Sequence, residues 1–150
     1  MNTKPTPKII LLADEQFTRH SEASIVELKD GSLLLAWSKF KDNHDNSYAH
    51  IASMTSIDEG HNWKNERTLI PNTAGLNVMS PALRRLKDGS LGLIYSYRES
   101  VRKACRHFCR SKDEGLTWSP PVVIGNESYL TGAHDRLTVL SSGRIIAPLH

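Results

Sequence analysis

The sequence predicts an all-β protein of the β-propeller type, because two turn motifs recur through it at a nearly constant interval. The motif Ser-x-Asp-x-Gly-x-x-Trp occurs at 56–63 and again at 111–118, about 55 residues later. The motif Leu-Lys-Asp-Gly-Ser-Leu occurs at 28–33 and 86–91, with a looser third copy at 140–145. No stretch shows convincing helical periodicity, which argues against an α/β fold.

Each Ser-x-Asp-x-Gly-x-x-Trp motif is expected to form a tight turn that its own side chains stabilise, called a locked turn below. The aspartate can accept hydrogen bonds from backbone N–H groups two residues on, and the glycine takes a positive φ that other residues resist. The tryptophan is expected to fold back as an apolar plug. These residues are therefore assigned to structure: Ser56, Asp58, Gly60, Trp63, Ser111, Asp113, Gly115 and Trp118.

One repeat unit reads as four antiparallel strands, since Asp-Gly between apolar runs is a strong hairpin signal. The first unit has strands at 24–28, 33–38, 49–55 and 67–70. The second has strands at 82–86, 91–97, 104–110 and 122–124. A third unit begins at Leu137 and stops after its second strand. The alternative is an ordinary β-sandwich with coincidental turns, although sandwiches rarely repeat their turns so regularly.

These units predict about two and a half propeller blades in a single partial domain, residues 1–150. Blade 1 is expected at about 17–70, blade 2 at about 78–125 and an incomplete blade 3 at about 134–150, after a lead-in at 1–16. A propeller closes with four to eight blades, so the chain is expected to be a fragment. Its open blade edges are expected to favour self-association.

The two Ser-x-Asp-x-Gly-x-x-Trp motifs, each roughly 25 residues after an Asp-Gly hairpin, resemble the Asp-boxes of sialidases (neuraminidases) and related bacterial-neuraminidase-repeat (BNR) proteins. The resemblance covers roughly residues 17 to 150. It implies the sialidase type of propeller, six-bladed when complete, of which this chain is an N-terminal fragment. In that superfamily the Asp-boxes mark the fold and lie away from the active site.

Antiparallel order sorts the connections between the two ends of the blades. If the short repeated turns lie at one end, the variable connections lie at the other, where binding and catalysis concentrate. These connections are 17–22, 39–48, 72–80, 97–103 and 129–136. They carry many groups that can bind or react: Arg19, His20, Glu22, Lys39, Asp42, His44, Asp45, Asn77, Arg98, Glu99, Arg102, His134, Asp135 and Arg136.

The connection at 39–48 is the most suggestive, because it places two carboxylates and an imidazole beside two lysines. A carboxylate partly buried by a ligand can rise in pKa and protonate a leaving oxygen. Sialidases carry an aspartate acid/base in the equivalent loop, about a dozen residues ahead of the first Asp-box. The resemblance therefore implies Asp45 as the first catalytic candidate and Asp42 as the second. An Asx-turn or an N–H cap is the structural alternative for Asp45.

The resemblance also implies contacts to substrate. Sialidases begin the first blade with Phe-Arg-Ile-Pro, whose arginine grips the substrate carboxylate in a bidentate geometry. Here Arg19 is displaced by about two residues from that place, and Lys39 stands where many sialidases have a second arginine. Asp135 can pair with its neighbour Arg136. The predicted substrate-binding residues are Arg19, Lys39, His44, Arg98, His134 and Arg136.

The net charge of +3 is modest and requires no special partner. Six cations fall between Arg98 and Lys112, but no nucleic-acid motif or aromatic stacking set accompanies them, so nucleic acid is not an expected partner. Cys105 and Cys109 are too far apart on an extended strand for a disulfide. With His107 expected on the opposite face, we predict no metal site and no cofactor.

Three functions remain open. The leading hypothesis is a sialidase-like glycoside hydrolase (exo-α-sialidase type) that removes a terminal acidic sugar from glycans, with the fragment itself inactive. The second is a propeller polysaccharide lyase, or another glycosidase, that uses histidine. The third is a non-catalytic carbohydrate-binding propeller. The N-terminal apolar run is too short for a secretory core, and no segment reaches membrane-spanning length, so a cytoplasmic location without a membrane partner is expected.

Overall fold

The computed structural model describes residues 10–125 and 129–150, and its first sheet contains the four strands expected for blade 1. These strands are β1 (Arg19–Glu27), β2 (Leu33–Phe40), β3 (Ala49–Ser56) and β4 (Lys64–Ile70). They hydrogen-bond in chain order, and each pair is antiparallel. Most of the predicted lead-in, residues 1–9, lies outside the described residues.

The second sheet repeats this plan. It contains β5 (Asn77–Arg85), β6 (Leu91–Ser100), β7 (Lys103–Ser111) and β8 (Val122–Ile124), again antiparallel and in chain order. Residues 126–128, which follow β8, lie outside the described part. The chain then forms a short hairpin of β9 (Thr138–Val139) and β10 (Ile145–Ile146). The all-β fold with four-stranded antiparallel blades is confirmed.

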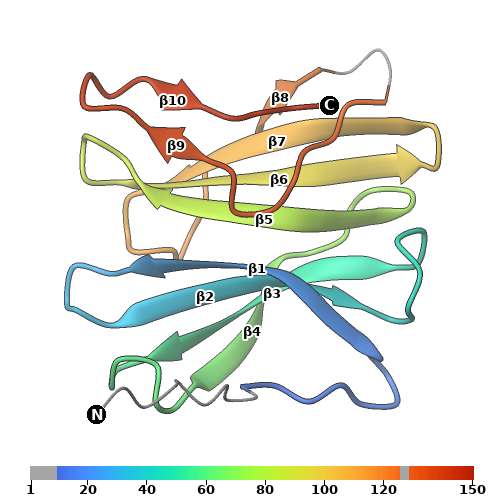
Figure 1. Ribbon diagram of the computed structural model, residues 1–150, viewed down its shortest axis with the longest axis horizontal. Coiled ribbons are helices and arrows are strands. Elements are labelled where there is room, and N and C mark those ends of the chain that lie inside the picture. Colours follow the sequence, from blue (N-terminus) through green and yellow to red (C-terminus); the bar gives the residue numbers. More distant parts are fainter. Residues whose placement is uncertain (1–9, 126–128) are drawn as a thin grey trace, which may run out of the picture.

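Figure 1 shows the two sheets stacked face to face, with the β9–β10 hairpin beyond the second sheet. The β1–β2 and β5–β6 hairpins lie on the left of that view, and the β2–β3 and β6–β7 connections lie on the right. The short repeated turns and the variable connections therefore occupy opposite ends of the blades. This is the separation that antiparallel order predicts.

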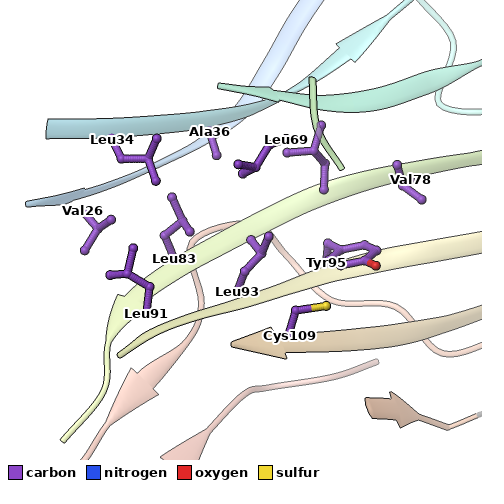
Figure 2. Packing of buried hydrophobic residues seen from close by; sticks show 11 residues of the cluster. Val26, Leu34, Ala36, Leu69, Val78, Leu83, Leu91, Leu93, Tyr95 and Cys109 are labelled. Carbon is purple, nitrogen blue, oxygen red and sulfur yellow. The ribbon is translucent and has the colours of Figure 1, made fainter. Parts of the chain in front are cut away.

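The core lies between the two sheets because strand alternation sends one set of apolar side chains from each sheet into that space. Figure 2 shows Leu34 and Ala36 of β2 opposite Leu83 of β5 and Leu93 of β6. All four side chains are buried. Burial of this shared face holds one blade against the next.

Strands β1 and β5 start well before the residues that the sequence predicts, and β4 starts at Lys64 rather than at residue 67. β1 begins at Arg19 rather than at residue 24, and β5 begins at Asn77 rather than at residue 82. Each strand contains a register shift, between Ser21 and Ser24 in β1 and in the matching part of β5. A bulge interrupts the alternation of apolar and polar residues, so the strand beyond it reads as a loop.

The connection predicted at 97–103 is also shorter than expected. β6 continues to Ser100, β7 begins at Lys103, and these two residues pair with each other. The polar composition of this hairpin tip concealed its extended backbone, because polar residues also populate loops.

The Ser-x-Asp-x-Gly-x-x-Trp turns are held by their own hydrogen bonds, as expected, but the aspartate bonds to a more distant backbone N–H than the sequence predicts. In the first turn, Asp58 Oδ1 accepts hydrogen bonds from Ser56 Oγ at 2.8 Å and from the backbone N–H of Asn62 at 2.8 Å. That N–H lies four residues on, not two. Gly60 has a φ of 86°, and the indole N–H of Trp63 donates to the Gly60 carbonyl at 3.0 Å. The aspartate thus caps a longer turn than an Asx-turn.

Replacement of Asp58 by asparagine is expected to remove an acid-dependent part of the stability. The hydrogen bonds from Asn62 and Ser56 lower the pKa of Asp58 to about 2. A depressed folded-state pKa stabilises the fold above the ordinary value of 3.8, and this contribution is lost as the pH falls towards about 2. Urea unfolding at pH 6 and at pH 2.5 measures the effect. The difference between wild type and Asp58→Asn should shrink at the lower pH, and an equal difference at both would contradict it.

The second turn also ties blade 2 to blade 1. Glu114 Oε1 and Oε2 accept hydrogen bonds from Arg85 at 2.8 Å and 2.6 Å, and Oε2 also accepts the backbone N–H of Lys29 at 3.0 Å. The bonds from Arg85 lower the pKa of Glu114 to about 2. Because Lys29 belongs to the first Asp-Gly hairpin, the repeated turns of both blades meet at the same end.

Candidate active site

A cavity of about 540 Å³ opens at the end opposite the locked turns. It is lined by the β2–β3 connection, the N-terminal halves of β1 and β5, the C-terminal end of β6, the segment that leads into β9, and His150 at the end of the chain. Its lining includes Glu22, Asp45, Ser80, Arg98 and His134. All five of these side chains can ionise or form hydrogen bonds, as expected for a site that binds a polar ligand.

Asp45 is held on the wall of this cavity from two sides. Its carboxylate Oδ1 accepts a hydrogen bond from Arg19 Nη2 at 2.7 Å, and its backbone carbonyl accepts from Asn77 Nδ2 at 2.8 Å and from Arg98 Nη1 at 2.5 Å. The Arg19 guanidinium in turn lies 3.7 Å from the centre of the Phe40 ring. The Asp45 side chain is 68% exposed, so its position is fixed while its carboxylate remains accessible.

Glu22 lies at the bulge of β1, with a φ of 60°. Its Oε2 accepts hydrogen bonds from Ser38 Oγ at 2.6 Å and from the backbone N–H of Ser80 at 3.0 Å. Ser80 occupies the bulge of β5 and has a φ of 55°. Glu22 therefore joins the two blades at the cavity and presents a carboxylate there.

Arg106 of β7 places a positive charge beneath the cavity. Its side chain is only 2% exposed, and its Nη1 donates to Ser96 Oγ at 2.7 Å and to the Gly132 carbonyl at 2.9 Å. Its Nη2 donates to the Ser80 carbonyl at 3.3 Å. Burial lowers its pKa to about 10, while the charge of Glu22 opposes that change. Arg106 thus fastens two segments of the cavity wall to blade 2.

The segment that leads into β9 and the residues after β10 form another side of the cavity. Residues Thr131 and His150 exchange backbone hydrogen bonds at 2.9 Å and 3.0 Å, and both line the cavity. Asp135 does not pair with its neighbour Arg136, which the sequence allowed. Its Oδ1 instead accepts hydrogen bonds from Arg84 Nη1 at 2.6 Å and from Ser24 Oγ at 2.7 Å, because the β9 segment packs against blades 1 and 2.

The structure brings only part of the predicted site together. Asp45, Arg98 and His134 line the cavity, and Arg19 reaches it through Asp45. Arg98 is 4% exposed, and its Nη2 donates a hydrogen bond to Asn46 Oδ1 at 2.8 Å. It therefore contributes a fixed positive charge to the cavity wall.

The other predicted residues lie outside the cavity lining. Lys39 is on the face of β2 that points away from blade 2, where its ammonium group pairs with Glu66. Asp42 accepts the backbone N–H of His44 at 2.8 Å in an Asx-turn, and both residues are exposed. Arg136 is exposed and forms no hydrogen bond with other residues in 10–125 and 129–150. Alternation along β2 explains the position of Lys39, because its neighbours Ser38 and Phe40 face blade 2.

Sequence reasoning did not single out Glu22 or Arg106. Glu22 was one of fourteen polar residues assigned to the variable connections. The bulge in β1, which the sequence did not predict, places it at the cavity. In the sequence, Arg106 is one of a run of cations on β7. Comparison of the strand register in the two blades distinguishes it from the others. Arg106 pairs with Ser96 in blade 2, while Ile51 pairs with Ser38 at the matching place in blade 1. A buried charge where the neighbouring repeat has isoleucine indicates a role beyond packing.

The expectation that His107 faces away from the two cysteines is wrong. Residues two apart on a strand share a face, so His107 lies on the same side of β7 as Cys105 and Cys109. Its ring stacks on Tyr97 at 4.3 Å between centroids, and its Nδ1 lies 3.3 Å from Tyr95 Oη. Both cysteines are free thiols, and no cluster of three or more His, Cys, Asp or Glu side chains suited to a metal occurs within the described ranges.

Comparisons with known proteins find related folds rather than related sequences. No protein-family model matches the chain, and no curated protein does. A Dyadobacter fermentans protein of unknown function aligns over 91% of this chain and 48% of its own, with 19% identity and a TM-score of 0.70. A Hadza microbial sialidase aligns over 85% of this chain and 31% of its own, with 18% identity and a TM-score of 0.68.

An α-L-arabinanase from Penicillium chrysogenum, solved with arabinobiose, aligns over 85% of this chain and 37% of its own, with 22% identity and a TM-score of 0.63. The chain therefore spans less than half the length of each of these structures. The similarity shows a propeller fold shared with glycoside hydrolases of more than one specificity.

In the described part of the chain, no helix is long and apolar enough to cross a membrane.

Proposed function

We propose that the whole protein is a propeller glycosidase that removes a terminal acidic sugar from a glycan, in the manner of an exo-α-sialidase. One observation carries the proposal. Asp45 presents an accessible carboxylate on a cavity wall, and Arg19, Asn77 and Arg98 fix its position. Neighbours of the same fold include sialidases, which supports this chemistry without defining the sugar.

Asp45 would act as the acid/base. A bound sugar that covers its carboxylate displaces water, and loss of water favours the protonated form that can donate to a leaving oxygen. Arg19 orients the carboxylate, while the positive charges of Arg98 and Arg106 favour an anionic ligand. Lys39, His44 and Arg136 do not line this cavity, so we assign them no contact with the reacting sugar.

A histidine-based lyase is the second candidate, because His134 and His150 both line the cavity. A lyase breaks the glycosidic bond by elimination and leaves an unsaturated sugar that absorbs ultraviolet light. A hydrolase leaves no such product. Ligand binding without either product would instead favour a carbohydrate-binding propeller.

The test is hydrolysis by the whole protein of fluorogenic glycosides that differ in charge. We expect release from a sialoside to exceed release from an arabinofuranoside by at least about tenfold in kcat/KM, because the cationic wall favours an acidic sugar. Absorbance of the products in the ultraviolet is followed in parallel. Preference for the neutral glycoside would refute the acidic substrate, and an unsaturated product would refute hydrolysis.

A further inference from the structure

We propose that Tyr129 binds the leaving group of the substrate, and that this leaving group is a second sugar. The inference rests on the proposed glycosidase function and extends it to the far side of the bond that is cleaved. It makes the substrate an oligosaccharide or a glycan, rather than an acidic sugar joined to a small group. Tyr129 serves here as a binding residue, through the face of its ring.

Tyr129 gives the cavity an accessible aromatic surface. Among the described residues that line the cavity, it is the only Phe, Tyr or Trp, and it is 42% exposed. Its hydroxyl forms no hydrogen bond with residues 10–125 or 130–150. One face of a sugar ring presents several C–H groups that pack on an aromatic ring, and a phenol can bond to the sugar hydroxyls. An accessible tyrosine in a polar cavity is therefore suited to bind a sugar.

Arg98 connects the ring of Tyr129 to Asp45. The Arg98 guanidinium carbon Cζ lies 5.7 Å from the centre of the Tyr129 ring, and Nη1 of Arg98 donates to the Asp45 backbone carbonyl at 2.5 Å. A general acid gives its proton to the leaving oxygen, so the leaving group lies next to the acid. Because Tyr129 shares a neighbour with Asp45, its ring lies on the leaving-group side of the cleaved bond.

The backbone around Tyr129 is fixed to blade 2. Tyr129 forms a parallel β-bridge with Ala104 of β7, and the N–H of Leu130 donates to the Ala104 carbonyl at 2.9 Å. Two residues further on, the hydroxyl of Thr131 lies 3.0 Å from Ser96 Oγ. A ring on a fixed backbone loses less conformational freedom when a ligand binds, which favours affinity.

Asn46 adds a polar group beside the ring. It follows Asp45 in the chain, lines the cavity and is exposed. Its Oδ1 accepts a hydrogen bond from Arg98 Nη2 at 2.8 Å, whereas its Nδ2 forms no hydrogen bond with other residues in the described ranges. An amide N–H can donate to a sugar hydroxyl. The leaving sugar can therefore form hydrogen bonds near the acid while its apolar face packs on Tyr129.

Tyr48 provides a matched control within the same molecule. It is 41% exposed, and Lys41 Nζ lies 5.1 Å from the centre of its ring. It belongs to the β2–β3 connection, as Asp45 does, but it is not among the residues that line the cavity. Truncation of Tyr48 or of Tyr129 therefore removes a similarly exposed ring beside a cation, and only Tyr129 borders the cavity.

The experiment compares Tyr129→Ala, Tyr129→Phe and Tyr48→Ala in the whole protein on two substrates. In the isomers of sialyllactose the leaving group is a disaccharide, whereas in sialyl fluoride it is a fluoride ion, which is too small to contact Tyr129. We expect Tyr129→Ala to lower kcat/KM by about 5- to 30-fold on sialyllactose and to keep it within about twofold on sialyl fluoride. Tyr129→Phe, which keeps the ring, and Tyr48→Ala should stay within about threefold of wild type on both substrates.

The two substrates separate this inference from the proposed function. If wild type hydrolyses sialyl fluoride and Tyr129→Ala shows no selective loss on sialyllactose, the role of Tyr129 is overturned and the glycosidase stands. An equal loss on both substrates also overturns that role, because it assigns Tyr129 to the fold or to the acidic sugar. A loss in Tyr129→Phe as large as in Tyr129→Ala would overturn packing on the ring. If wild type hydrolyses neither substrate, both proposals are overturned.

Discussion

Asp45→Asn is expected to lower kcat/KM on an acidic glycoside by about 100- to 10,000-fold, the range that a general acid contributes. Asparagine keeps an oxygen for the hydrogen bond from Arg19 and leaves the bonds from Asn77 and Arg98 to the backbone carbonyl in place. The loop should therefore keep its position and lose only its transferable proton. Steady-state kinetics with a fluorogenic sialoside, alongside thermal unfolding, measure the two effects separately.

Asp42→Asn is the matched control for that substitution. Asp42 lies in the same loop and differs from Asp45 by capping the N–H of His44 without lining the cavity. We expect its kcat/KM to remain within about threefold of wild type. Equal turnover by Asp45→Asn and wild type would remove Asp45 from the mechanism. A large loss in Asp42→Asn alone would transfer the acid/base role to that residue.

Leu83→Ala should reduce the free energy of unfolding by about 2–5 kcal/mol, the usual cost of truncating a buried leucine. Leu83 lies on β5 with no exposed surface, and it packs between the two sheets beside Leu34 and Leu93 (Figure 2). The cavity left by truncation falls on the face that joins the blades, where rigid backbones on both sides oppose collapse. Urea denaturation at neutral pH gives the value from the transition midpoint and slope.

Leu116→Ala is the control for that prediction. Leu116 belongs to the second locked turn and is 71% exposed, so the same change in side chain removes little buried surface. Its cost should stay below about 0.5 kcal/mol. Similar losses in the two variants would contradict a shared core between the blades.

The strands and turns could be predicted because neighbours in the sequence decide them. Asp-Gly pairs between apolar runs fix hairpins, and the residues from Ser56 to Trp63 carry every group needed for their own lock. The same local logic assigned the variable connections to one end of the blades, and Asp45 is found at that end. It failed where a bulge breaks the alternation, as at the starts of β1 and β5.

The site itself could be predicted only in part, since proximity across blades leaves no local signature. The sequence named Asp45, Arg98 and His134, which line the cavity, but also Lys39, which alternation sends to the other face of β2. It allowed Asp135 to pair with the adjacent Arg136, whereas packing of the β9 segment supplies Arg84 as the partner. For Asp135, a contact near in sequence competed with one near in space.

By itself, then, the sequence determined a repeating four-stranded blade, its locked turns and the end at which chemistry can gather. Tertiary structure alone decided that Glu22 reaches Ser80 in the next blade and that Arg106 lies buried under the cavity. The physical reason is the separation along the sequence over which each interaction acts. Turn geometry and strand alternation depend on residues a few positions apart, whereas a site between blades depends on how two sheets, far apart in the sequence, bury their apolar faces together.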